Sequence, residues 1–185
     1  SKNTYQVIVS DIGMPGEDGC SLLGRIKPLQ PRARAIAVSA FARPEDAERV
    51  IGATLDRLGR LDILVNNAAT NPYAGPTIDV DLPRWEKTLQ VNLTAPLFWT
   101  QLAWQRFMRE NGGAIVNISS VGGLATNPIL GVYDVSKAAL IHLTKQLAAE
   151  LGPRVRVNAI APGLIRTDFA RALWEEGRGE QVAKA

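Results

Sequence analysis

The sequence has very few of the residues that build disulfide frameworks and zinc sites. It contains one cysteine, Cys20, and one histidine, His142, in 185 residues. A single cysteine excludes an intramolecular disulfide framework and favours a reducing compartment, so we expect a cytoplasmic protein. One cysteine and one histidine cannot complete a four-ligand zinc site, so we expect no metal.

Long apolar runs and a strong excess of one charge are also missing. No uncharged apolar run approaches the roughly 18 residues that a membrane-spanning helix needs, and residues 1–4 lack the apolar stretch of a signal peptide. The 21 basic and 18 acidic residues leave a dispersed net charge of +3. Because 46% of the residues are hydrophobic, the chain can bury a core. We expect a folded protein that binds neither nucleic acid nor a membrane.

What the sequence does contain is a regular alternation of two kinds of segment. Five short runs rich in valine and isoleucine have the length and composition of strands buried in a parallel sheet. These runs are residues 5–10, 35–39, 61–65, 114–118 and 155–160. Segments with helical periodicity lie between them at 21–29, 44–58, 82–110 and 133–151, and the tail from Asp168 is expected to be helical. The alternation predicts one α/β domain over residues 1–185, with a three-layer, doubly wound, five-stranded parallel sheet.

The expected order of the strands is 2-1-3-4-5, the flavodoxin-like arrangement. With right-handed crossovers, a change of direction after the second strand places the helices at 21–29 and 44–58 on opposite faces of the sheet. The simple order 1-2-3-4-5 would leave one face of an apolar sheet uncovered.

Five motifs follow one another in the larger part of the chain. They are Asn66-Asn67-Ala68-Ala69, Val91-Asn92-Leu93, Ile118-Ser119-Ser120, Tyr133-Asp134-Val135-Ser136-Lys137 and Pro162-Gly163-Leu164-Ile165-Arg166-Thr167. Their types and order closely resemble the short-chain dehydrogenase/reductase family over residues 58–185. The resemblance implies a parallel α/β fold and hydride transfer between a nicotinamide cofactor and a substrate.

The resemblance also implies a role for each matching residue. Tyr133 would be the general acid/base, and Lys137, four residues on and on the same helix face, would favour the tyrosinate and bind the nicotinamide ribose. Ser120 would hydrogen-bond the reacting oxygen, and Asn92 would connect Lys137 to solvent through water. The resemblance further implies that Pro162, Gly163, Ile165 and Thr167 shape the nicotinamide pocket and that Asn66 and Ala68 line the adenosine side. A general alternative is that Tyr133 is a half-buried aromatic residue and Lys137 a solvated charge.

The first quarter of the chain has a different pattern. The stretch from Asp11 to Gly19, with Ala37-Val38-Ser39-Ala40, resembles the middle of a bacterial response-regulator receiver domain over residues 4–52. In that family the aspartate accepts phosphate and the serine senses it, and Asp11 and Ser39 match those positions. The acidic pair that holds magnesium and the Lys-Pro at the last strand are missing, so we expect Asp11 and Ser39 to be inactive capping or strand-end groups.

Neither family pattern is complete, and the two meet inside one helical segment at 44–58 without a linker. Natural fusions usually join whole domains through exposed linkers. The sequence therefore predicts an engineered chimera of a receiver-like half, residues 1–52, and a dehydrogenase-like half, residues 53–185.

The interpretation as a chimera also determines which cofactor we expect. Dinucleotide affinity depends on a glycine-rich turn at a helix N-terminus. Gly13, Gly16 and Gly19 have a similar spacing, but Pro15 removes one N–H and carboxylates surround the turn. We therefore expect no cofactor, or weak NAD(P) binding at most, and a scaffold without native activity. The alternative is an NAD(P)-dependent short-chain dehydrogenase/reductase that acts on a carbonyl or alcohol substrate; a phosphorylation module is a third, weaker option.

Apolar side chains on two predicted helices suggest self-association. Leu97, Trp104, Phe107 and Met108 recur within 82–110, and Leu140, Leu143 and Leu147 form a second stripe within 133–151. The resemblance implies that these helices pack on the same pair of a second subunit, which predicts a two-fold homodimer. The alternative is that these side chains are ordinary core residues facing the sheet.

Overall fold

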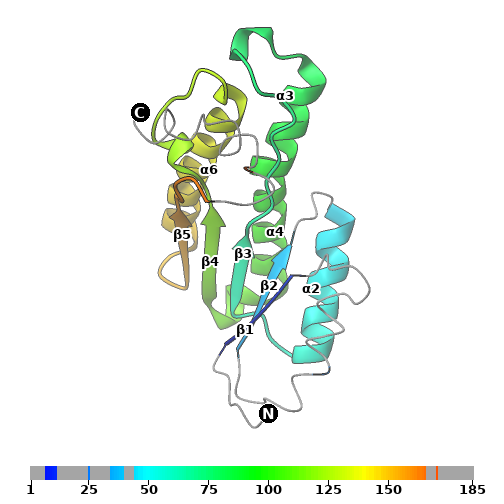
Figure 1. Cartoon of the computed structure of the whole chain (residues 1–185). Helices are drawn as coiled ribbons and strands as arrows, with labels where there is room; N and C mark the ends of the chain where they lie inside the picture. The colour runs from blue at the N-terminus through cyan, green and yellow to red at the C-terminus, as the bar shows by residue number, and fades with distance from the viewer. Residues whose placement is uncertain (1–6, 12–24, 26–33, 40–43, 166–169, 171–185) are drawn as a thin grey trace.

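Five parallel strands form one sheet in the computed structural model, which describes residues 7–11, 25, 34–39, 44–165 and 170 (Figure 1). The five strands are β1 (Val7–Asp11), β2 (Arg34–Ser39), β3 (Ile63–Asn66), β4 (Gly113–Ile118) and β5 (Val155–Ile160). Each strand overlaps one of the apolar runs, so the existence of the strands and the parallel α/β class are confirmed.

The order of the strands differs from the predicted one. The sheet runs β1-β2-β3-β4-β5, and β2 pairs with both β1 and β3. The flavodoxin-like order 2-1-3-4-5 is therefore wrong. The prediction assumed that helices of the chain must cover both faces of the sheet, and that assumption required the direction to reverse after the second strand. The strands instead succeed one another in a single direction.

The helical segments match the periodicity closely. Helix α2 (Pro44–Leu58) has the predicted bounds, and α6 (Gly131–Leu151) begins two residues before the predicted start. Between β3 and β4 a continuous helical stretch consists of α3 (Leu82–Leu89), a π-helical segment (Gln90–Thr94), α4 (Ala95–Ala103), a second π-helical segment (Trp104–Met108) and α5 (Arg109–Asn111). Two short 3₁₀ turns lie at Thr77–Asp79 and Val121–Gly123. The predicted helix at 21–29 and the helical tail lie outside the described residues, apart from Arg25 and Ala170.

Local sequence explains where α2 begins and ends. Pro44 stands at its first position, where the missing N–H has no helical partner in any case. Glu45 and Asp46 occupy the first turn, where the helix dipole favours carboxylates. The helix ends before Gly59, which adopts a φ of 69° and donates its N–H to the carbonyl of Leu55 at 2.8 Å. A left-handed residue at this place is the common glycine stop of a helix.

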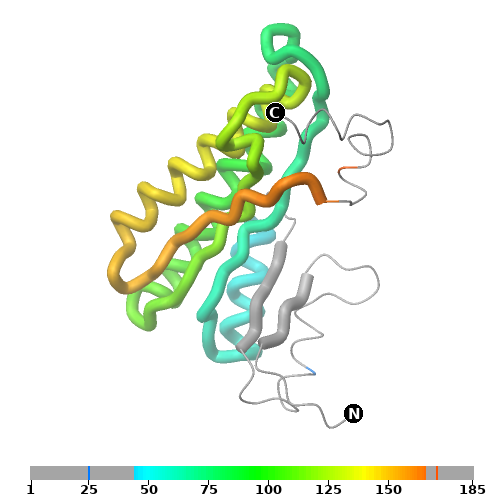
Figure 2. The backbone as a smooth tube through the Cα atoms, turned by 60° about the vertical axis from the view of Figure 1, so that its left-hand side comes forward, coloured from blue at the N-terminus to red at the C-terminus, as the bar shows by residue number. Residues whose placement is uncertain are grey.

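Helices α2, α4 and α6 pack on the same face of the sheet (Figure 2). Their buried side chains form one cluster with Leu64 of β3, Ile115 of β4, and Val155 and Val157 of β5. Right-handed crossovers between strands that advance in one direction put every connecting helix on one side. In β5, Arg156 and Asn158 alternate with the two buried valines and are exposed. The described part of β5 is thus buried on one face only.

The apolar stripes on the two long helical stretches belong largely to this core. Met108, Leu140 and Leu147 are buried, and Leu97, Trp104, Phe107 and Leu143 are partly buried against the core cluster. These contacts agree with the alternative that the two apolar stripes are core residues facing the sheet. Within the described ranges, we find no helix that combines the length and hydropathy needed to cross a membrane.

Candidate functional site

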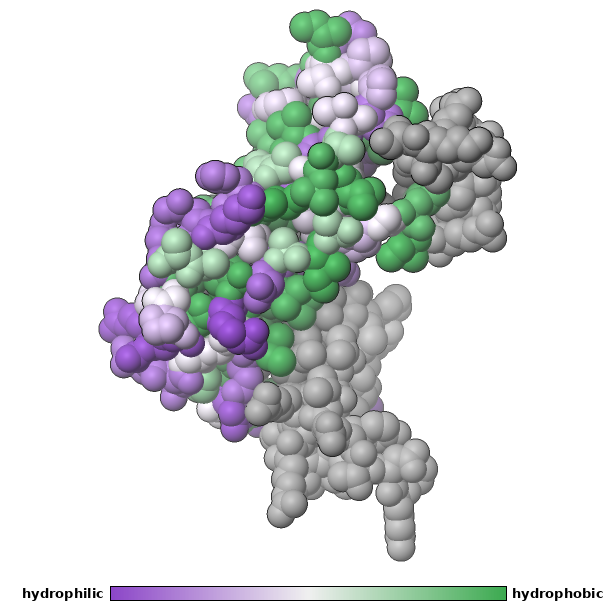
Figure 3. Space-filling model, turned by 90° about the vertical axis from the view of Figure 1, so that its left-hand side faces the viewer, coloured by the Kyte–Doolittle hydropathy of each residue, from purple (hydrophilic) through white to green (hydrophobic). Residues whose placement is uncertain are grey.

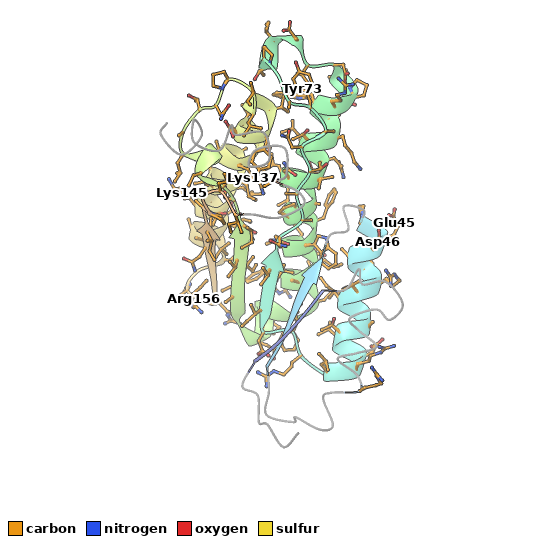
Figure 4. The ribbon with its side chains drawn as sticks, viewed as in Figure 1. Glu45, Asp46, Tyr73, Lys137, Lys145 and Arg156 are labelled. Carbon is orange, nitrogen blue, oxygen red and sulfur yellow. The ribbon has the colours of Figure 1, made fainter. Side chains whose placement is uncertain are left out.

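Most of the candidate residues gather at one edge of the sheet. Strands β3, β4 and β5 end at Asn66, Ile118 and Ile160, and the candidate motifs follow directly after these ends. In open parallel sheets, ligands bind at the carboxyl ends of the strands. Figure 4 shows Lys137 of α6 at this edge, beside the end of β4, whereas Arg156 of β5 lies farther down the sheet.

Tyr133, Ser120 and Lys137 form a contiguous cluster there. Tyr133 lies in the first turn of α6 and is half-buried, and its hydroxyl hydrogen-bonds with that of Ser120. The ammonium of Lys137 lies 5.6 Å from the centroid of the Tyr133 ring. Ser120 also accepts a hydrogen bond from the N–H of Gly122 at 3.1 Å. A hydroxyl has one proton to donate and two lone pairs. Since Gly122 takes one lone pair, the Ser120 proton is available for Tyr133 or for a substrate oxygen.

Lys137 is almost completely buried, with 1% of its surface exposed. Its Nζ donates to the carbonyl of Ile118, at the end of β4, over 2.7 Å. Burial disfavours the charged form and lowers the pKa of Lys137 to about 8. The position of Lys137 in the core excludes the alternative of a solvated surface charge.

The pKa of Tyr133 is raised above its ordinary value. Burial is the main cause and the charge of Asp134 adds to it, while the hydrogen bond from Ser120 lowers the pKa. The sequence led us to expect that Lys137 would lower this pKa. The net direction is opposite, because burial of the phenol outweighs the groups that favour tyrosinate.

Asn92 is completely buried in the first π-helical segment of the stretch between β3 and β4. Its side chain accepts from the N–H of Thr70 at 2.8 Å and donates to the carbonyl of Thr70 at 3.0 Å. It also donates to the hydroxyl of Ser136 at 2.9 Å, which in turn donates to the carbonyl of Tyr133. Asn92 therefore joins the loop after β3 to the first turn of α6. Irregular π turns of this kind are frequent at functional sites.

The two residues expected on the adenosine side differ in exposure. Asn66 is buried, and its amide donates to Asn117 of β4 at 2.8 Å. Asn117 donates in turn to Thr144 of α6 at 2.8 Å. Ala68 is half-buried in the loop after β3. The Asn66 side chain is thus held within a polar chain that ties β3, β4 and α6 together.

The residues expected around nicotinamide follow β5. Pro162 is half-buried and accepts from the N–H of Val121, next to Ser120, at 3.0 Å. Gly163 and Ile165 are exposed. Thr167 lies outside the described residues. Large exposed hydrophobic side chains lie in this region and in the turn after Ser120, namely Val121, Leu124, Ile160, Leu164 and Ile165.

Figure 3 shows hydrophobic residues gathered over the middle of the face on the β5 side of the molecule. Ligand sites are commonly apolar with a few placed polar groups. The carboxyl edge of the sheet combines apolar surface with placed polar groups, because the cluster of Tyr133, Ser120 and Lys137 lies beside these apolar side chains.

The two phosphoacceptor-like residues are described only by their backbones. Asp11 pairs with Val38 across β1 and β2, and Ser39 pairs with Asn66 across β2 and β3. Ser39 thus ends its strand at the same edge as Asn66. The glycine-containing turn at 12–24 lies outside the described residues. Within the described ranges, no group of three or more histidine, cysteine, aspartate or glutamate side chains could hold a metal ion.

Several residues of this edge were not predicted from the sequence. Asp134 and Ser136 stand inside the Tyr133–Lys137 motif, at positions that the resemblance leaves open. Asn117 was counted as part of an apolar run, yet it is buried and bonds on both sides. The available signal was that an asparagine in a buried strand must find hydrogen-bond partners.

A parallel α/β sheet with a tyrosine, a serine and a lysine at its carboxyl edge defines a class of Rossmann-like proteins. A family model described as "Enoyl-(Acyl carrier protein) reductase" matches residues 4–185. The "Dehydrogenase/reductase SDR family member 4" of Homo sapiens is 43% identical over 148 residues, which cover 80% of this chain and 53% of that protein. The protein of the same name from Mus musculus is 39% identical over 181 residues, covering 91% and 65%. The chain belongs to the short-chain dehydrogenase/reductase family.

A solved structure extends the comparison. The gluconate 5-dehydrogenase from Burkholderia cenocepacia, in complex with NADP and tartrate, is 28% identical, with a TM-score of 0.73 over 90% of this chain and 64% of that one. The present chain spans between 53% and 65% of the length of the human and mouse relatives.

These findings correct three expectations. The family model includes residues 4–52, so the receiver-domain half and the engineered chimera are wrong. The short aspartate- and glycine-containing pattern after β1 is not specific to receiver domains, because it occurs here within a dehydrogenase/reductase chain. The inactive scaffold is replaced by the reading that the sequence offered as the alternative. The expectation of no cofactor is overturned by the NADP held in a family structure.

Proposed function

We propose that the protein is a nicotinamide-dependent oxidoreductase that interconverts a carbonyl compound and the corresponding alcohol. The observation that carries this proposal is the contact of Tyr133 with both Ser120 and Lys137 at the carboxyl edge of the sheet. The hydroxyls of Tyr133 and Ser120 can bind one substrate oxygen, and the phenol can exchange a proton with that oxygen.

The described residues fit a nicotinamide cofactor on its reactive side. The ammonium of Lys137 has three protons, and one of them is used by the carbonyl of Ile118. The other two are suited to the ribose hydroxyls of a nucleotide. Pro162, Gly163 and Ile165 would flank the nicotinamide ring, and the ring supplies or accepts the hydride when the cofactor is bound.

Each residue of the cluster has a separate part in this proposal. Ser120 orients the substrate oxygen, Tyr133 transfers the proton, and Lys137 binds the ribose and provides the positive charge near the phenol. Asn92 holds the loop after β3 against α6 and so supports the position of Tyr133.

Replacement of the phenol hydroxyl tests the proposal directly. We expect reduced nicotinamide cofactor to bind saturably to the wild type and to Tyr133→Phe with similar affinity, measured by its fluorescence. With a panel of ketones and aldehydes, kcat of Tyr133→Phe should fall by at least about 10²-fold, within the range that one general acid/base contributes.

Tyr73→Phe is the matched control, because it removes a hydroxyl that donates to the carbonyl of Pro76 on an exposed loop. This variant should keep wild-type turnover. Absence of saturable cofactor binding to the wild type would contradict the proposal, and so would equal turnover by Tyr133→Phe and wild type.

We also retain two predictions that concern the protein as a whole. The single cysteine supports a cytoplasmic location. The continuous alternation of strands and helices supports one domain over residues 1–185.

A further inference from the structure

Asp134 is a buried carboxylate directly beside the proposed catalytic tyrosine. It lies in the first turn of α6 and exposes 5% of its surface. One oxygen, Oδ2, accepts from the N–H of Asn127 at 2.9 Å. The other, Oδ1, is buried and has no hydrogen-bond partner within the described part of the chain. Burial raises the pKa of Asp134 to about 6. A carboxylate in such surroundings is costly and calls for a role.

The unpartnered oxygen packs against the backbone of the turn that starts at Ser120. A Cβ atom on Gly122 would collide with Oδ1 of Asp134, so this approach is open to glycine alone. The N–H of the same glycine donates to Oγ of Ser120. Asp134 therefore contacts the turn at both of its ends, at Gly122 and at Asn127.

These contacts form a continuous path from Asp134 to the reacting groups. Asp134 holds the segment between Gly122 and Asn127 on the first turn of α6, and Gly122 then fixes one lone pair of Ser120. The remaining proton of Ser120 is directed to Tyr133, whose pKa the hydrogen bond lowers. We propose that Asp134 is a positioning residue that clamps the turn after Ser120 onto α6 and so sets the Ser120–Tyr133 hydrogen bond.

This inference rests on the proposed function of Tyr133, but it has a readout that needs no turnover. Amide hydrogen exchange at Asn127 reports directly on its bond to Asp134. We expect exchange at Asn127 to be about tenfold faster in Asp134→Ala, the factor that one hydrogen bond contributes. Asp134→Asn keeps an acceptor oxygen and should remain close to wild type. Glu150→Ala, at the exposed end of the same helix, is the control and should leave exchange at Asn127 unchanged.

The pH profile separates positioning from a general structural effect. Both Asp134→Ala and Asp134→Asn remove the charge that raises the pKa of Tyr133, but only the alanine variant also loses the clamp. In alcohol oxidation, which requires tyrosinate, the acidic limb of kcat/KM for the alcohol, which reports the enzyme before the alcohol binds, should therefore lie at higher pH in Asp134→Ala than in Asp134→Asn. We expect kcat of Asp134→Ala to be about tenfold lower than kcat of Asp134→Asn, with the same KM for cofactor in both variants.

Gly122→Ala provides an independent test of the contact. The added methyl group should displace the turn and lower kcat, and removal of the carboxylate in the double variant Gly122→Ala/Asp134→Ala should recover part of that loss. Unchanged exchange at Asn127 in Asp134→Ala, or coincident acidic limbs of the two Asp134 variants, would overturn the inference. A wild type that shows no turnover would refute the proposed function, while the exchange measurement would still decide the role of Asp134.

Discussion

Lys137 shows how one residue can serve the site at the expense of stability. Its ammonium is buried, donates to the carbonyl of Ile118 and lies over the ring of Tyr133. The lowered pKa means that the folded state binds the proton more weakly than the unfolded chain does. A protonated lysine at this position therefore destabilises the fold at neutral pH. The proposed function explains why such a group would stand next to Tyr133.

Substitution of this lysine should stabilise the protein while abolishing activity. The change in pKa from 10.5 to about 8 corresponds to an upper limit of about 3 kcal/mol. Loss of the hydrogen bond from Lys137 to the carbonyl of Ile118 reduces this gain in stability by about 1 kcal/mol. We expect Lys137→Met to raise the free energy of unfolding at pH 7 by about 1 to 2 kcal/mol, measured by urea denaturation.

The pH dependence identifies the cause of that gain. Between pH 8 and 10.5 the unfolded wild type binds a proton that the folded state has lost, so wild-type stability rises with pH in this window. The advantage of Lys137→Met should therefore shrink above pH 8 and be gone by about pH 10. Lys145→Met, on an exposed position of α6, is the control and should change stability little at any pH. A Lys137→Met variant that is less stable than wild type at pH 7 would refute this account.

The residues that sequence could predict are those with a distinctive spacing. Tyr133 and Lys137 are four positions apart on one helix, and Ser120 ends a recognisable strand motif; the structure brings all three together. Asp134 and Asn117 could not be found in this way. Their roles depend on contacts with Asn127, Gly122 and Thr144, which only the packing of strands and helices determines.

At the scale of the elements, the apolar periodicity fixed where the strands and helices lie. It could not predict the π-helical segments within residues 82–111, because each spans five residues, too few to reveal a different period inside a long stretch that otherwise follows the α-helical repeat. One of these segments places Asn92 against Thr70 and Ser136. A π-helical segment of five residues thus determines where Asn92 meets the loop after β3 and helix α6.

The polar chain that joins β3, β4 and α6 leads to a prediction about Thr144. Its hydroxyl donates to the carbonyl of Leu140 and accepts from the amide of Asn117. Thr144→Val keeps the shape but leaves that buried amide donor without its partner. We expect the free energy of unfolding to fall by about 1 to 3 kcal/mol, measured by thermal and urea denaturation.

Two other buried threonines provide matched controls for this change. Thr54 and Thr88 also donate to the carbonyl four residues earlier in their helices, at 2.8 Å each. In the described contacts, neither hydroxyl accepts a hydrogen bond from a buried amide. Thr54→Val and Thr88→Val should therefore lower the free energy of unfolding by less than about 1 kcal/mol. An equal loss in all three variants would show that the helix bond alone, and not the link to Asn117, determines the effect.

At the scale of the whole molecule, the strand order was the part that sequence reasoning could not supply. Local patterns identify strands but not their neighbours, and the requirement that both faces be covered selected the wrong order. The observed order places α2, α4 and α6 together, and the alternating burial of Val155 and Val157 with Arg156 and Asn158 agrees with a sheet covered on one side along β5.

The same arrangement leaves the outer face of α6 available for association. The stripes first proposed for a dimer lie largely in the core, but Val135, Ala138, His142 and Ala149 recur at helical spacing and are exposed. We propose a two-fold homodimer in which the helical stretches at 82–110 and 133–151 meet their counterparts. Light scattering should then give a mass of about twice the 20.0 kDa of one chain.

A charge on this outer face should separate the subunits. Ala138 lies within the exposed stripe, between Val135 and His142, so in the proposed two-fold dimer it would face the partner. Ala138→Glu would place like charges together in a desolvated contact, so we expect it to yield the monomer mass with an unchanged circular dichroism spectrum. Lys145→Glu, about two turns away on the same face, should weaken the dimer less. A wild type that already scatters as a monomer at micromolar concentration would refute the proposed dimer.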